Sequence, residues 1–208
     1  MLNKPIILIG NGGHASVLTE ILLTQNRTIL GYTAPSQESN TFGLQYIGPD
    51  MAIQNYNPNE IELILGIGTV NVSNIRKSLF ERMKQLGFQF AKVIHGQTIL
   101  SPSVTLGEGV QIMAGAIIQT NVKVGNNTII NTGACIDHDS NIGEHVHIAP
   151  RVTISGGVKI KNGCHVGTGA TLIQGITLGN DSLIGAGAVV IHNIAAGKKA
   201  IGVPAKEV

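Results

Sequence analysis

Seven histidines are the side chains of this sequence best suited to proton transfer, because an imidazole titrates near neutral pH. They are His14, His95, His138, His145, His147, His165 and His192. His138 has the most suggestive neighbours, since Asp137 and Asp139 flank it and a carboxylate can orient the ring and raise its basicity. This arrangement suits a general base. A solvated turn histidine with charged neighbours accounts for the same residues equally well.

The segment that contains His138 is a long repeat. An aliphatic residue occurs at every sixth position from Leu100 to Val190, and a second, smaller residue follows each one after four positions. This period fits neither an α-helix nor a β-hairpin, and it is the signature of hexapeptide β-helices. Three units would close one triangular coil, so residues about 18 apart should lie above one another. The large aliphatic side chains of about five stacked coils would then form one continuous core.

The composition agrees with such a prism. The chain has 27 glycines, 3% aromatic residues and no tryptophan. Glycine and asparagine tolerate the positive φ angles that sharp corners need. The asparagines expected at such corners are Asn121, Asn126, Asn127, Asn162 and Asn180.

The repeat spacing also predicts what surrounds the histidines. Gly156 should lie one coil above His138, and with Gly157 it would leave an open notch beside the ring. His147 and His165 have the same spacing and should stack on neighbouring coils. Two histidines without a third ligand make a poor zinc site, so no metal is expected.

Residues 5 to about 95 are expected to form an α/β unit with a small parallel sheet. Alternating strands and helices predict a parallel sheet whose ligand crevice lies at the carboxyl ends of the strands. A first helix should follow the loop that begins at Gly10, and a second should bury Ile75, Leu79, Met83 and Leu86 on one face. The expected strands are Ile6–Ile9, Thr28–Tyr32, Ile61–Ile67 and Phe90–Ile94.

The first loop fits the pattern G-x-G-x-x-A at Gly10, Gly12 and Ala15. Glycines there let backbone N–H groups and a helix N-terminus approach a phosphate. Binding of NAD would require an acidic residue at the end of the second strand, but no carboxylate occurs there before Glu38. The loop therefore favours another phosphate-bearing ligand.

The hexapeptide repeat resembles the left-handed parallel β-helix of hexapeptide-repeat acyltransferases. With the Gly12-Gly13-His14 loop on a small α/β domain, the chain is similar to bacterial nucleotide-sugar N-acetyltransferases of glycan assembly, which are related to sialic acid O-acetyltransferases. The ending Gly202-Val203-Pro204-Ala205-Lys206 is also similar to that family, although a proline-terminated cap over the last coil explains it as well. The resemblance implies an α/β nucleotide-sugar-binding domain over residues 1–95 and a β-helix acetyltransferase domain over 96–208.

The resemblance also implies roles for particular residues. His138 would be the catalytic base and Asp139 its support, although Asp139 is shorter than the family's usual glutamate. Acetyl-CoA, the co-substrate, would contact His147, Thr168 and Ala186, and we expect the Gly156 backbone N–H to lie near its acetyl carbonyl. The nucleotide would contact Gly12, Gly13, His14 and Gly68. The family's aspartate pair after the second strand is replaced by Ala34 and Pro35, so Tyr32 or Thr33 would substitute for it.

The expected function is therefore N-acetylation, by acetyl-CoA, of the 4-amino group of a UDP-linked amino-dideoxy sugar of the diacetylbacillosamine type. The alternatives are O-acetylation of sialic acid, N-acetylation of a GDP-linked amino sugar, and a non-catalytic sugar-nucleotide-binding scaffold. The resemblance implies a homotrimer with acetyl-CoA between adjacent prisms. A net charge of +2 and 12% charged residues do not suggest nucleic-acid binding. No signal peptide or membrane span is expected, and two cysteines fit a reducing cytoplasm.

Overall fold

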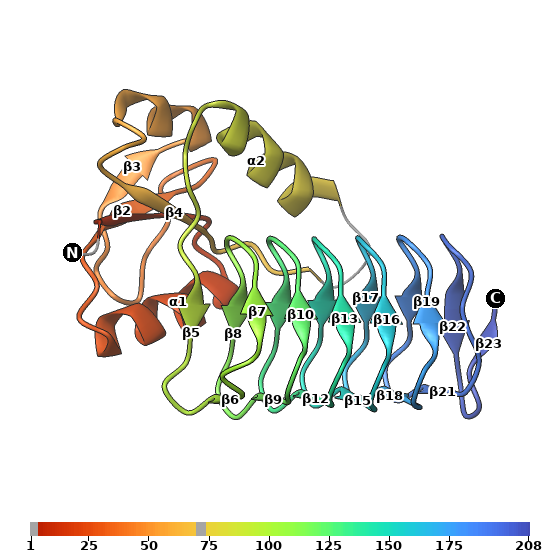
Figure 1. The fold of residues 1–208 in the computed structure, drawn as a ribbon. Coiled ribbons are helices and arrows are strands. Elements are labelled where there is room, and N and C mark those ends of the chain that lie inside the picture. The colour runs from red at the N-terminus through yellow and green to blue at the C-terminus, as the bar shows by residue number, and fades with distance from the viewer. Residues whose placement is uncertain (1–3, 70–73) are drawn as a thin grey trace. The chain divides into compact units, whose positions relative to one another are not determined.

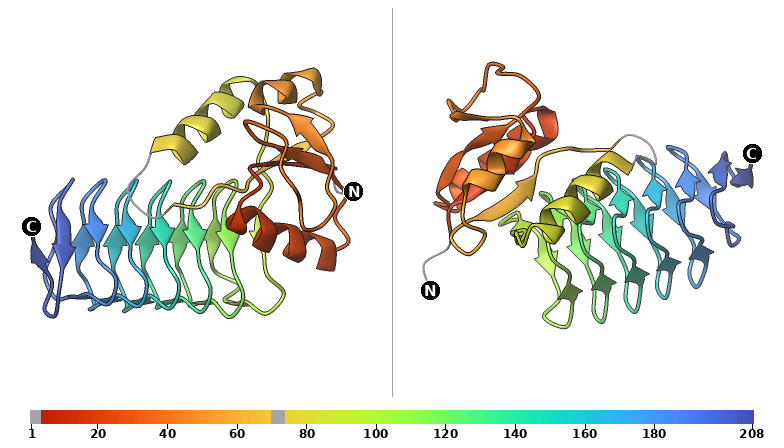
Figure 2. Two further views of the ribbon diagram at one scale, coloured as in Figure 1. Left: turned by 180° about the vertical axis from the view of Figure 1, so that it is seen from behind. Right: turned by 90° about the horizontal axis from the view of Figure 1, so that it is seen from above.

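The computed structural model describes residues 4–69 and 74–208. These residues form two compact units, with 4–69 and 74–93 in the first and 94–208 in the second (Figures 1 and 2).

The first unit is built on a four-stranded sheet with the order β3-β2-β1-β4, in which every pairing is parallel. Its strands are β1 (Ile6–Ile9), β2 (Ile29–Thr33), β3 (Tyr46–Gly48) and β4 (Glu62–Leu65). Its helices are α1 (Gly13–Thr24), the 3₁₀ helix η1 (Asp50–Asn55) and α2 (Asn74–Gln85). Because the strands are parallel, the loops after all four strands lie along one edge of the sheet. The sequence pattern had predicted β1, β2 and β4 to within about two residues at each end, but it missed β3 and η1.

Two expectations for this unit were wrong in detail. The second helix buries Arg76, Phe80 and Met83, whereas Ile75 is 63% exposed and Leu86 is 39% exposed. The strand expected at Phe90–Ile94 is also divided. Phe90 makes a single parallel bridge to Leu63, and only β5 (Val93–Ile94) is a strand, at the edge of the eight-stranded sheet.

The second unit is the predicted prism of short strands, and it is a left-handed parallel β-helix. Three sheets form its walls. The five-stranded sheet contains β7 (Thr105–Leu106), β10 (Lys123–Val124), β13 (Asn141–Ile142), β16 (Lys159–Ile160) and β19 (Thr177–Leu178). The six-stranded sheet contains β6 (Ile99–Leu100), β9 (Ile117–Ile118), β12 (Cys135–Ile136), β15 (Thr153–Ile154), β18 (Thr171–Leu172) and β21 (Val189–Val190). The eight-stranded sheet contains β5, β8 (Gln111–Ile112), β11 (Ile129–Ile130), β14 (His147–Ile148), β17 (His165–Val166), β20 (Leu183–Ile184), β22 (Lys199–Ile201) and β23 (Lys206–Glu207).

The register of the prism follows the sequence repeat. Ile136 pairs with Ile118 on one side and Ile154 on the other, so each coil takes up three hexapeptides. Ile136 is fully buried, as is the smaller Ala134 of the second series. The last strand, β23, runs antiparallel to β22 and ends the stack. The one continuous core predicted from the sequence is confirmed.

The corners of the prism repeat as regularly as its core. A residue with positive φ recurs at six-residue steps through most of the prism, and where it is not glycine it is Asn121, Asn127, Asp139, His145, Arg151 or Asp181. The expectation that Asn126, Asn162 and Asn180 have positive φ was wrong. Their side-chain oxygens instead accept backbone N–H groups of Glu108, Glu144 and Asn162 from the neighbouring coil. These asparagines therefore tie consecutive coils together.

Candidate active site

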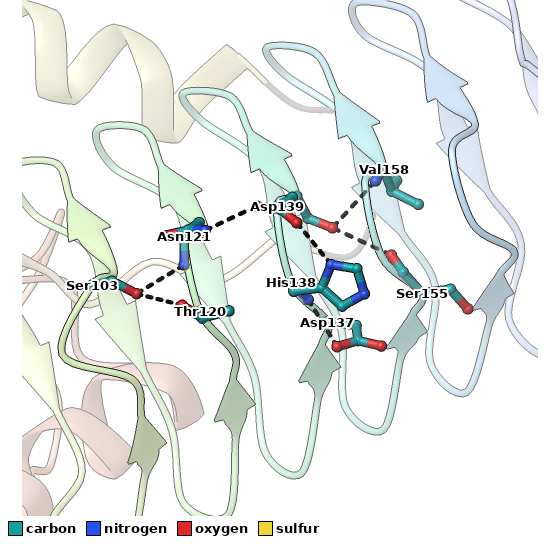
Figure 3. A network of polar contacts seen from close by, with 9 residues as sticks. Ser103, Thr120, Asn121, Asp137, His138, Asp139, Ser155 and Val158 are labelled. Atoms are coloured by element: carbon teal, nitrogen blue, oxygen red, sulfur yellow. Dashed lines mark hydrogen bonds and ion pairs between the residues drawn. The ribbon is translucent and has the colours of Figure 1, made fainter.

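His138 lies on the turn between β12 and β13, at the corner where the six-stranded sheet meets the five-stranded sheet. The core side chains Ile136 and Ile142 anchor both ends of this turn. The turn itself faces solvent, and the side chains of His138 and Asp139 are 56% and 57% exposed. Figure 3 shows the turn with its neighbours on the adjoining coils.

Both flanking carboxylates contact His138, one at the ring and the other at the backbone. Its Nδ1 lies 2.8 Å from Oδ2 of Asp139, while Oδ1 of Asp137 accepts the backbone N–H of His138 at 2.8 Å (Figure 3). An ionised carboxylate can only accept a hydrogen bond, so the proton of a neutral His138 ring belongs on Nδ1. The lone pair of Nε2 is then free to take a proton.

The same contacts set the acidity of the pair. The hydrogen bond to Asp139 and the negative charge of Asp137 raise the pKa of His138 above its ordinary value. In return, hydrogen bonds from His138 and Asn121 lower the pKa of Asp139. The imidazole is therefore a stronger base than usual, and its partner stays ionised at neutral pH.

Gly156 makes room for this ring. It lies on the next coil at the same corner, between β15 and β16. A Cβ atom at Gly156 would lie 2.7 Å from both Cε1 and Nε2 of His138, which is closer than real contacts allow. The His138 ring therefore lies over Gly156, and the glycine expected there from the repeat is needed so that the ring can do so.

The residues expected to contact acetyl-CoA lie on other parts of the same prism. Thr168 follows β17 and Ala186 follows β20, so both occupy the corner between the eight-stranded and six-stranded sheets. They are stacked on neighbouring coils, where the Thr168 carbonyl accepts the backbone N–H of Gly187. His138 belongs to a different corner, so a single prism does not bring these residues together.

His147 and His165 stack on neighbouring coils as predicted, in β14 and β17 of the eight-stranded sheet. Their rings meet edge to face with centroids 5.0 Å apart, and Nε2 of His147 lies 3.3 Å from the side-chain nitrogen of Asn131. Both histidines are buried, and burial lowers the pKa of His165. Within the described residues no group of three or more His, Cys, Asp or Glu is placed to hold a metal ion.

In the first unit, Gly12, Gly13 and His14 begin helix α1 at the edge where the strands end. Gly12 is the N-cap residue and makes no side-chain capping bond, and the first turn carries no acidic residue. A Cβ atom at Gly68 would lie 3.3 Å from the Cβ of His14, so the loop after β4 packs against the first turn of α1. The four residues expected to bind the nucleotide are thus brought together beside a helix N-terminus, a favourable place for a phosphate.

Tyr32 and Thr33, expected to replace the missing aspartate pair, point into the protein. The Tyr32 hydroxyl donates to the carbonyl of Glu38 at 2.6 Å, and the Thr33 hydroxyl donates to Oδ1 of Asp50 at 2.8 Å. Both residues are almost completely buried. Their backbones are engaged as well, since the Tyr32 N–H donates to the carbonyl of Gln45 and the Thr33 carbonyl accepts the N–H of Gly10.

The structure adds residues to which the sequence analysis gave no part in the site. Asp50 follows β3 at the same edge of the sheet, and its side chain is 28% exposed. Asn11 in the first loop accepts a hydrogen bond from Asn40 at 2.6 Å, which joins that loop to the β2–β3 connection. Asn121 donates to Asp139 from the coil below. The turn signal Gly48-Pro49-Asp50 was visible in the sequence, but a three-residue strand before it was too short to recognise.

Comparison with known families identifies both units. Residues 5–83 match the PglD N-terminal domain, and residues 103–138 and 139–174 match the bacterial transferase hexapeptide family of six repeats. A single-residue variant of perosamine N-acetyltransferase from Caulobacter crescentus, in complex with CoA and GDP-perosamine, is 34% identical. It covers 98% of this chain and 96% of its own, with a TM-score of 0.90. This chain belongs to the hexapeptide-repeat sugar N-acetyltransferases.

Two further members of this family are informative. The acetyltransferase domain of PglB from Neisseria gonorrhoeae FA1090, in complex with acetyl coenzyme A, is 30% identical, covers 100% of both chains and has a TM-score of 0.92. UDP-N-acetylbacillosamine N-acetyltransferase of Bacillus subtilis (strain 168) is 38% identical over 113 residues, which are 53% of this chain and 52% of that protein. The match therefore spans about half the length of this curated relative.

These findings confirm the expected family and fold class. In addition, none of the helices in the described part of the chain is long and apolar enough to cross a bilayer.

Proposed function

We propose that this protein transfers an acetyl group from acetyl-CoA to the 4-amino group of a nucleotide-linked amino-dideoxy sugar. The observation that carries this proposal is the His138–Asp139 pair beside Gly156: a basic imidazole, a carboxylate that orients it, and a glycine that leaves room for the ring. The relatives support the same class of reaction, since the proteins similar over nearly the whole chain include a perosamine N-acetyltransferase and an acetyltransferase domain.

In the proposed reaction, the amine nitrogen of the sugar attacks the thioester carbonyl carbon while Nε2 of His138 removes a proton from that amine. Asp139 holds the other ring nitrogen and stabilises the imidazolium that forms. Collapse of the tetrahedral intermediate expels the CoA thiolate and leaves the N-acetyl sugar, and the His138 imidazolium gives its proton to the thiolate, which restores the neutral base. Among the described residues none accepts a hydrogen bond from the Gly156 N–H, so this group is free to stabilise the oxyanion.

Gly12, Gly13, His14 and Gly68 would hold the nucleotide diphosphate at the N-terminus of α1. We propose a UDP-linked sugar of the diacetylbacillosamine type as the acceptor, in line with the Bacillus subtilis relative. A GDP-linked amino sugar is a second candidate. It is favoured by the perosamine enzyme, whose similarity extends over 98% of this chain, and by the loss of the aspartate pair at Ala34 and Pro35.

We further propose that the working unit is a homotrimer with acetyl-CoA bound between adjacent prisms. Thr168 and Ala186 occupy one corner of the prism and His138 another, so a site containing all three residues requires two chains. The outward row of the six-stranded sheet, which joins these corners, includes Ile99, Ile117 and Val189. The outward row of the five-stranded sheet instead carries Lys123 and Lys159, and it is less suited to an interface.

The test is release of free CoA thiol from acetyl-CoA with a panel of acceptors: UDP- and GDP-linked 4-amino sugars and free sialic acid. Turnover with a UDP-linked amino sugar supports the leading proposal, and turnover with only the GDP-linked sugar supports the second. His138→Ala should lower turnover by about 100-fold or more, while His192→Ala serves as a matched control. The proposed mechanism would be contradicted if the wild-type protein released no CoA thiol with any acceptor of the panel, or if His138→Ala had unchanged turnover.

A further inference from the structure

A ladder of polar side chains runs along the corner that carries His138. Ser103, Asn121 and Asp139 occupy equivalent positions on three successive coils, 18 residues apart (Figure 3). Oγ of Ser103 accepts the backbone N–H of Asn121 at 2.9 Å, and it also lies 2.9 Å from the hydroxyl of Thr120. The side-chain nitrogen of Asn121 then donates to Oδ1 of Asp139 at 3.1 Å. The ladder ends at the imidazole of His138.

Each oxygen of Asp139 therefore has its own partner. Oδ1 accepts from Asn121 on the coil below, and Oδ2 meets Nδ1 of His138 on its own turn. Asp139 is more than half exposed, so water competes for both oxygens, and its carboxylate would otherwise rotate freely about χ2. A donor fixed to the neighbouring coil limits that rotation and keeps Oδ2 directed at the ring.

We propose that Asn121 is a positioning residue for acetyl transfer: its side-chain amide holds Asp139 in the orientation that keeps His138 correctly protonated and aimed. This inference rests on the proposed role of His138 as the base. Aspartate has a shorter reach than the family's usual glutamate. The hydrogen bond from Asn121 would therefore help to orient a carboxylate that the longer side chain could place by itself.

A purely structural role for Asn121 would have a different signature. Asn121 has φ of 60°, and it could be present only because asparagine tolerates a left-handed corner. Aspartate occupies the equivalent corner at Asp139, and glycine does so at Gly157. Both aspartate and glycine therefore preserve the corner at position 121, while each changes what Asp139 meets.

The experiment compares Asn121→Asp and Asn121→Gly with wild type, and uses Asp181→Gly as a control at a corner of the same φ on another edge of the prism. The charged groups that act on His138 are Asp137 and Asp139, and its neighbours from the adjoining coils, Asn121 and Gly156, are neutral. Asn121→Asp adds a negative charge beside the pair, so it should move the acidic limb of kcat/KM to higher pH. Asn121→Gly should lower kcat about tenfold or more with little change in either KM.

A second measurement separates this inference from the proposed function. NMR titration of the His138 imidazole, identified by its loss in His138→Ala, needs no substrate. A raised imidazole pKa in Asn121→Asp, with no change in Asp181→Gly, supports the coupling even if the acceptor panel shows no turnover. If both Asn121 variants kept the wild-type pKa of the His138 imidazole and the wild-type kcat, Asn121 would serve only to form the corner, and the proposal would be overturned.

Discussion

At the scale of single residues, the site depends on the space around one imidazole. The ring of His138 lies over Gly156, and a Cβ there would come within 2.7 Å of two ring atoms. Backbone strain is not an obstacle to a substitution, because only the following residue, Gly157, has positive φ. The glycine at position 156 is therefore needed for the placement of the ring rather than for the turn.

We expect Gly156→Ala to keep the fold and to lose activity. The added methyl group must push the ring of His138 away, and a displacement of about 1 Å at a catalytic group lowers kcat by up to about 100-fold. Turnover and the thermal unfolding midpoint are the measurements. Gly96→Ala is the control, since a Cβ at Gly96 meets no atom within 4 Å. Normal turnover in Gly156→Ala would show that the His138 ring does not act as the base from its position over Gly156.

The pH dependence of the reaction follows from the groups around His138. A base must be unprotonated to act, so kcat/KM should rise with pH through the pKa of His138, which is raised above its ordinary value of about 6.5. Asp137→Asn removes a negative charge that stabilises the imidazolium, so it should shift this limb to lower pH. If the acidic limb of kcat/KM did not shift in Asp137→Asn, it would report the titration of a group other than His138. Glu81→Gln on helix α2 is the control for removal of a negative charge.

At the scale of elements, one corner of the prism is tight because coils approach each other closely. Gly107, Gly125, Gly143 and Gly179 follow strands of the five-stranded sheet, and a Cβ at any of them would lie within 3 Å of atoms on the next coil. None of these four glycines has positive φ. They are needed for close approach, which lets side-chain oxygens such as that of Asn126 reach the backbone of the adjacent coil.

Gly125→Ala should therefore destabilise the prism although the backbone angle suits alanine. Its methyl group would lie 2.6 Å from the backbone carbon of Gly143, and overpacking of this kind costs about 1–3 kcal/mol. Urea unfolding followed by circular dichroism measures the loss, with Gly96→Ala again as the control. Equal free energies of unfolding for the two variants would mean that neighbouring coils can move apart at this corner without loss of stability.

At the scale of the whole molecule, the proposed site needs two chains because its residues lie on different corners. Thr168 and Ala186 share one corner, and His138 and Gly156 share another. In a trimer each site would take one corner from each of two neighbouring subunits. A site shared by two chains predicts that two different inactive variants can restore activity in a mixed trimer, whereas a site within one chain predicts no restoration.

Co-expression of His138→Ala with Ala186→Trp, each inactive alone, should restore turnover. Some interfaces of a mixed trimer then combine the intact His138 corner of one chain with the intact Ala186 corner of the other, which gives about one quarter of wild-type activity. His138→Ala mixed with Gly156→Ala is the control, because both changes affect the same corner. No restoration in mixed trimers isolated with two affinity tags would place the whole site on one chain.

The prism, its register and the coil-to-coil neighbour of His138 could be predicted from the amino-acid sequence. A β-helix repeats one local conformation, so a spacing of six residues fixes which side chains face the core and which lie one coil apart. The positions of Gly156 above His138 and of His165 beside His147 followed from counting alone. The family resemblance then rested on short motifs in this regular frame and on the glycine loop of the first unit.

The directions of individual side chains could not be predicted in this way and depend on the folded protein. Tyr32 ends the expected strand and Thr33 follows it, yet their hydroxyls are bonded inside the protein to Glu38 and Asp50. Helix α2 buries Arg76 and exposes Ile75, because the sheet edge offers carbonyls of Leu65 and Ile67 to the guanidinium. Asn121 was counted as a corner residue, and its bond to Asp139 appears only when two coils are placed one above the other. Periodicity determines where a residue lies, whereas hydrogen bonds to residues far apart in the sequence determine what its side chain does.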